Sequence, residues 1–123
     1  VWDAGIPPSM ATRPGQTLAT MTYRAKLLAP QLAELGLKPE DIEFFAISHS
    51  HYDHIGEANL FAGSTWIVDK AERDWMFRPD ARKSGAFAFY SQLEGAKTTL
   101  IEDGKDFDVF GDGRTSRLRA RSL

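Results

Sequence analysis

Residues 47–57, ISHSHYDHIGE, decide how the rest of the sequence is interpreted. They contain all three histidines of the 123-residue chain, His49, His51 and His54, and Asp53 lies between the last two. In an extended segment alternate side chains point the same way, so we expect His49, His51 and Asp53 on one side, joined by His54 as the chain turns. Imidazole nitrogens and carboxylate oxygens bind zinc, and a zinc-bound water has a pKa of about 7. The segment therefore predicts a zinc site that generates hydroxide at neutral pH.

A chance gathering of exposed histidines is the alternative interpretation. A purification tag would be consecutive and terminal, whereas these histidines are spaced and internal. The cluster also follows residues 43–48, a short apolar run typical of a strand covered on both faces. Ligand loops commonly lie beyond the carboxyl ends of strands in open α/β sheets, which favours the metal site.

Strands and helices are expected to alternate along the chain, which indicates an α/β fold. Proline and glycine separate these segments. Beyond the strand at 43–48, we expect strands at 65–69, 98–102 and 106–110, a helix at 70–77 and a further helix within 85–95.

An earlier helix is expected from Thr17, a candidate N-cap, to Gly36, a candidate C-terminal stop. Apolar residues recur there at spacings of three and four, at Leu18, Met21, Ala25, Leu28, Leu32 and Leu35. Pro30 lies inside this pattern, and since proline lacks the amide donor, we expect a kink or break at that residue.

The composition restricts the remaining function classes. Fifteen basic and seventeen acidic residues give a net charge of −2, which provides no general attraction to nucleic acid or to an anionic membrane. The chain has no cysteine, so disulfides, thiolate zinc sites and cysteine nucleophiles are excluded. No apolar run approaches the ~18 residues of a membrane span. The compartment stays undetermined.

The motif resembles a known family. His49-Ser50-His51-Tyr52-Asp53-His54 resembles the His-x-His-x-Asp-His signature of the metallo-β-lactamase superfamily, and Asp3-Ala4-Gly5 is similar to its Asp-x-Gly turn. The resemblance implies a partial αββα sandwich and one or two zinc ions. It implies that His49 and His51 bind the first zinc and that Asp53 and His54 bind the second. Asp53 would also orient the bridging hydroxide or accept its proton.

The resemblance covers residues 1–113, which we interpret as the central part of such a domain, truncated at both ends. In the family, a third histidine, a bridging aspartate and a last histidine follow the position equivalent to Gly113, but no histidine follows His54 here. The family's opening hairpin is also missing. With fewer ligands for each metal, we expect weaker metal binding, and the fragment is expected to be inactive unless ligands come from elsewhere.

Residues 114–123 form an arginine-rich tail with three open interpretations. Its arginines, Arg114, Arg117, Arg119 and Arg121, make a basic patch without aromatic partners, which is a weak signal for nucleic acid or lipid. A frayed, solvated tail is the ordinary alternative. The third is a non-native, out-of-frame sequence, which resequencing the gene would test.

The function implied is a zinc-dependent hydrolase in which water attacks a lactone, a β-lactam or a related ester or amide. Residues 32–37, 39–42 and 61–68 are similar to lactonase-like members, which favours a lactone. The expected partner is a small-molecule substrate, without nucleic acid or membrane. The alternative is a non-catalytic metal-binding or assembly module, in which a homo-oligomer would share a site between chains.

Several neighbouring residues have two open interpretations. Glu57 would accept an imidazole N–H or act as a first-turn helix acid, and Tyr52 would hydrogen-bond a substrate or act as a spacer. Asp3 is the better candidate for orienting a ligand, because the family's Asp-x-Gly turn lies under the metal site. The aromatic residues Trp66, Trp75 and Phe77 would line an acyl pocket, but core packing is favoured.

Overall fold

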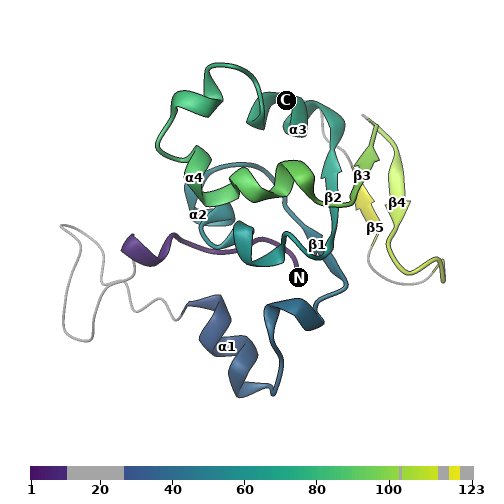
Figure 1. Ribbon diagram of the computed structural model, residues 1–123. Coiled ribbons are helices and arrows are strands. Elements are labelled where there is room, and N and C mark those ends of the chain that lie inside the picture. The colour runs from purple at the N-terminus through teal and green to yellow at the C-terminus, as the bar shows by residue number, and fades with distance from the viewer. Residues whose placement is uncertain (11–26, 103, 114–116, 120–123) are drawn as a thin grey trace, which may run out of the picture.

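The computed structural model describes residues 1–10, 27–102, 104–113 and 117–119 (Figure 1). The strands are β1 (Phe44–Ala46), β2 (Thr65–Asp69), β3 (Thr98–Ile101), β4 (Asp106–Asp108) and β5 (Arg117–Arg119). The helices are α1 (Leu28–Glu34), α2 (Tyr52–Ile55), α3 (Lys70–Met76) and α4 (Phe87–Tyr90). Short 3-10 turns lie at Pro8–Met10, Pro39–Asp41, Ala58–Phe61, Ala81–Lys83 and Ser91–Gly95.

A parallel sheet in the order β1-β2-β3 forms the centre of the fold. The N-terminal residues extend it on the free side of β1, where Trp2 makes a parallel bridge to Ala46 and the Asp3 N–H donates to the Ala46 carbonyl at 2.8 Å. All strands of a parallel sheet end at the same edge. The segments that follow Asp3, β1 and β2 are therefore brought together, although they are far apart in the sequence.

The two faces of the sheet are covered differently. One face packs against helices in a core that includes Phe45, Phe61 and Trp66. The other face presents Ala46, Ile67 and Ile101 to the β4 segment. Figure 1 shows the β4–β5 hairpin on the side of β2 and β3 opposite to α4. This helix–sheet–hairpin layering is an α/β arrangement and a partial αββα sandwich, so the predicted fold class is confirmed.

Helix α1 differs from the expected long helix. It begins at Leu28, so Pro30 lies in its first turn, where an amide donor has no intrahelical partner and a proline causes no break. The predicted kink at Pro30 is therefore wrong, and the expected helix is interrupted instead at Leu27, whose backbone is extended. The predicted stop at Gly36 is confirmed: its φ is +74°, and the N–H groups of Gly36 and Leu37 donate to Ala33 and Leu32 carbonyls in a Schellman arrangement. Thr17 lies outside the described residues.

The later elements follow the expected order, β2 with its expected bounds and the other strands and α3 with shorter ones. The helix expected within 85–95 is α4, which is followed by a 3-10 turn. Strand β4 ends at Asp108, whose carboxylate accepts the N–H groups of Gly111 and Gly113 and so folds the chain into a turn. A frayed tail was one of three interpretations of residues 114–123, and it is wrong for residues 117–119, which pair antiparallel with β4 as β5. Among the described residues, no helix is both long enough and apolar enough to cross a membrane.

Candidate metal centre

The histidine-rich loop leaves the carboxyl end of β1 and turns into a helix earlier than expected. His51 is the N-cap of α2, and the His54 N–H donates to the His51 carbonyl at 2.9 Å. The extended alternation predicted through Asp53 is therefore wrong, because Asp53 and His54 lie on a helical turn. The turn still gathers the three imidazoles. The His49 ring centroid is 4.5 Å from that of His51 and 4.1 Å from that of His54.

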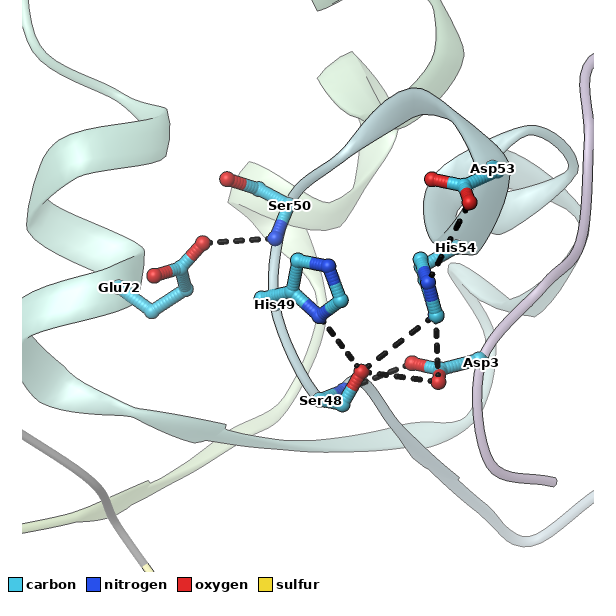
Figure 2. Close-up of polar contacts among 7 residues, drawn as sticks. All are labelled: Asp3, Ser48, His49, Ser50, Asp53, His54 and Glu72. Carbon is cyan, nitrogen blue, oxygen red and sulfur yellow. Dashed lines mark hydrogen bonds and ion pairs between the residues drawn. The ribbon is translucent and has the colours of Figure 1, made fainter. Parts of the chain in front are cut away.

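Asp3 lies beneath this cluster, as the resemblance implied (Figure 2). Its Oδ1 accepts the Ser48 N–H at 2.7 Å, and its Oδ2 accepts the Ser48 hydroxyl at 2.9 Å. The same Oδ2 lies 2.9 Å from Nδ1 of His54. Asp3 has a φ of +59°, a left-handed conformation that aspartate tolerates better than most residues. One carboxylate thus orients both the start of the loop and its last histidine.

This network assigns the protons on two imidazoles. A carboxylate only accepts, so Nδ1 of His54 is the donor to Asp3, and Nε2 of the neutral ring keeps its lone pair. The Ser48 hydroxyl gives its single proton to Asp3, so it accepts from Nδ1 of His49 at 2.8 Å. In both rings Nε2 is therefore the nitrogen whose lone pair can bind a metal. This arrangement is typical of metal-binding histidines, whose second nitrogen is fixed by a hydrogen bond.

Asp53 provides an oxygen donor beside these nitrogens. Its Oδ2 lies 3.6 Å from Nε2 of His54, and its side chain is half exposed. Within the described part of the chain, no three acidic or histidine side chains lie in an arrangement that would already hold a metal ion. The donor types nevertheless fit zinc, because imidazole nitrogen and carboxylate oxygen are its usual ligands in cysteine-free sites.

Backbone contacts with the N-terminal segment hold α2 in place. The Ala4 N–H donates to the His54 carbonyl at 2.7 Å, and the Gly56 N–H donates to the Gly5 carbonyl at 2.8 Å. A Cβ atom at Gly56 would collide with the backbone of Ile6 and Pro7. The glycine after the motif is therefore needed for this close approach.

The Glu57 side chain does not hydrogen-bond the histidines. Its side chain is 8% exposed, and its Oε2 accepts the Leu28 N–H at 2.6 Å, at the start of α1. Both earlier interpretations are therefore wrong: the carboxylate neither contacts an imidazole nor caps its own helix. It satisfies a free donor at the N-terminus of a distant helix instead.

Glu72 is a residue of the site that the sequence analysis missed. It is the third residue of α3, its side chain is 7% exposed, and its Oε1 accepts the Ser50 N–H at 2.7 Å. Figure 2 shows it reaching the loop from the side opposite to Asp3. The signal was present in the sequence: the segments after two neighbouring parallel strands meet at one edge, and Glu72 follows β2 as Ser50 follows β1.

The aromatic residues divide between core and surface. Trp66 is fully buried and Phe77 packs against the core, so the predicted packing role is confirmed for both. It is wrong for Trp75, which is 55% exposed and carries the Arg78 guanidinium 3.5 Å above its ring. Arginine stacking keeps an indole at the surface without burying it. Tyr52 is 49% exposed beside the histidines.

Comparison with known proteins gives several matches. The chain is 33% identical over 91 residues to the N-acyl homoserine lactonase AttM of Agrobacterium fabrum. The matched region covers 72% of this chain and 35% of that protein. It is 36% identical over 58 residues to an N-acyl homoserine lactonase of Bacillus cereus, covering 47% of this chain and 23% of that one. The chain thus spans about a third of the length of the first relative.

Solved structures match as well. A structure of B. thuringiensis AiiA with N-decanoyl-L-homoserine at its active site has a TM-score of 0.60 and 22% identity, over 88% of this chain and 44% of that one. An N-acyl homoserine lactone hydrolase with N-hexanoyl-L-homoserine at its catalytic metal centre gives the same TM-score and identity. The family model described as "Metallo-beta-lactamase superfamily" matches residues 1–119. With that match over nearly the whole chain, and with Asp3 and the gathered histidines in place, the chain belongs to the metallo-β-lactamase superfamily.

Proposed function

We propose that this chain carries the metal-binding part of a zinc-dependent hydrolase that opens lactones. The observation that carries the proposal is the hydrogen-bond network from Asp3 to His54, and through Ser48 to His49, which keeps the Nε2 lone pair of both imidazoles for a metal. The lactonase relatives support the choice of a lactone over a β-lactam.

The ligand roles follow the family motif. His49 and His51 would hold one zinc, and Asp53 and His54 would hold a second. When bound, zinc would polarise the substrate carbonyl and lower the pKa of a water molecule. Asp53 would orient that water and accept its proton on a carboxylate oxygen. Asp3 would keep the His49 and His54 rings in the tautomer that binds metal.

The substrate class is argued from the relatives and from exposure. An acylated homoserine lactone presents a polar ring and an apolar chain. Tyr52 lies next to the proposed ligands and is half exposed, so its ring and hydroxyl would contact such a substrate. The polar lactone would then lie toward Asp53 and the histidines.

The test combines metal content with hydrolysis. Zinc would be measured by elemental analysis, and opening of an N-acyl homoserine lactone and of a β-lactam would be followed before and after chelation. We expect bound zinc that chelation removes and that is lost in His51→Ala but kept in the exposed Lys83→Ala control, with lactone opening only where a second copy of the chain supplies the missing ligands. Zinc-dependent dimerisation without turnover would instead support a non-catalytic assembly module. A chain that binds no zinc contradicts the proposal.

A further inference from the structure

Glu72 is a buried carboxylate that accepts a hydrogen bond from a backbone amide of the histidine loop. Its Oε1 accepts the Ser50 N–H at 2.7 Å. An ionised group removed from water needs a strong partner, and a hydrogen bond to a charged acceptor is stronger than a neutral one. The contact joins two elements 22 residues apart in the sequence. It fixes the loop relative to α3.

Ser50 is the residue between His49 and His51. Its N–H belongs to the peptide that follows His49, and its Cα leads directly to His51. Holding that amide restricts rotation of the backbone on both sides, and therefore the directions of the two side chains. In the structure the two rings lie 83° apart with centroids 4.5 Å from each other. A metal ion held by both would need their directions to be maintained.

Helix α3 is a rigid support for this contact. Its N-terminus is capped by Asp69, whose Oδ1 accepts the Ala71 N–H at 2.7 Å. At its other end Met76 is buried, and its carbonyl accepts the Tyr90 hydroxyl at 2.8 Å. Glu72 and Met76 lie one turn apart on the same buried side of the helix. The carboxylate is therefore presented to the loop from a fixed position.

We propose that Glu72 is a positioning residue that sets the geometry of His49 and His51 for metal binding through the Ser50 amide. This inference rests on the proposed function, because it concerns the same metal site. Asp3 and Glu72 then hold the loop from opposite sides. Asp3 orients the His54 ring directly and the His49 ring through the Ser48 hydroxyl, in each case at Nδ1. Glu72 acts through the backbone between the first two proposed ligands. Glu72 itself contacts neither metal nor substrate.

The test compares Glu72→Gln, which keeps an acceptor oxygen for the Ser50 N–H, with Glu72→Met, which keeps length and packing but removes the acceptor. Glu57→Met is the matched control, because it removes an equally buried carboxylate from an amide outside the loop. Zinc affinity would be measured by competition with a chromophoric chelator. Hydrogen exchange of the Ser50 amide would be measured on the metal-free chain, and stability by urea unfolding.

We expect Glu72→Met to weaken zinc binding about 10- to 100-fold, the effect typical of groups that orient metal ligands, and to speed exchange at Ser50. Glu72→Gln should restore most of both, and Glu57→Met should change neither. Zinc affinity in Glu72→Met equal to that of the wild type overturns the inference, as does an equal loss in Glu57→Met. A wild-type chain that binds no zinc contradicts the proposed function itself, a result separate from any difference between the variants.

Discussion

Glu57 and Glu72 are chemically alike and serve different parts of the molecule. Both are buried, and each accepts one backbone N–H from a segment more than twenty residues away. Glu57, three positions after His54, fastens α1, whereas Glu72, far from the motif in sequence, fastens the histidine loop. Closeness in sequence to a motif is therefore a poor guide to which residues support it. The parallel sheet decides, because it brings the ends of its strands to one edge.

The largest effect is expected where the loop and the N-terminal segment make backbone contact. Gly56→Ala would place a methyl group against Ile6 and Pro7, and backbone cannot move aside as a flexible side chain can. We expect loss of at least about 3 kcal/mol of stability, at or above the usual range for overpacking, with the site lost as a consequence. Urea unfolding followed by tryptophan fluorescence measures it. Gly63→Ala, whose Cβ would meet open space, is the control and should remain folded.

Asp3→Asn changes the carboxylate that contacts the proposed ligand His54 directly. Asparagine tolerates the left-handed conformation and keeps an oxygen for the Ser48 N–H. Its amide nitrogen cannot accept from Nδ1 of His54, so the ring orientation is lost. We expect zinc affinity to fall about 10- to 100-fold with little change in unfolding. Unchanged affinity in a chelator competition would show that Asp3 has no orienting role.

Glu57→Met tests whether this glutamate stabilises the fold without affecting zinc affinity. Removing the acceptor leaves the Leu28 N–H without its partner, which costs roughly 1–3 kcal/mol when the donor is buried. We expect the midpoint of urea unfolding to fall while zinc affinity in the folded protein stays at the wild-type value. Metal affinity that falls together with stability would mean that the two glutamates do not have separate roles.

A smaller, pH-dependent effect is expected at Tyr90, which holds the end of α3. Burial raises the pKa of Tyr90 above its ordinary value of 10.0, so its contribution to stability is present below that pH and is lost as the pH rises through the folded-state pKa. Tyr90→Phe removes the hydroxyl that donates to the Met76 carbonyl, at a cost of about 1 kcal/mol near neutral pH. Urea unfolding from pH 7 to 11 should show a weaker alkaline loss in the variant. An unchanged alkaline profile would contradict the assignment to Tyr90.

Local patterns predicted much of the fold. Strand β2 was predicted with its observed bounds, and α3 to within one residue, because the apolar run 65–68 and the following capped helix are signals carried by adjacent residues. The kink at Pro30 and the core position of Trp75 were wrong, since both depended on facts outside the local pattern: where α1 begins and what covers α3.

The amino-acid sequence alone indicated the candidate metal ligands. Three histidines and an aspartate within six positions, after an apolar strand and with Asp3-Ala4-Gly5 upstream, indicated the family and the chemistry of the site. The resemblance already indicated Asp3 as an orienting group, but the roles of Glu72 and Glu57 followed from the tertiary structure alone. Asp3 contacts His54, 51 positions away in the sequence, and Glu72 contacts Ser50, 22 positions away. Glu57 contacts the start of α1 instead of the loop. Such contacts depend on the order of strands in a parallel sheet, which no short stretch of sequence encodes.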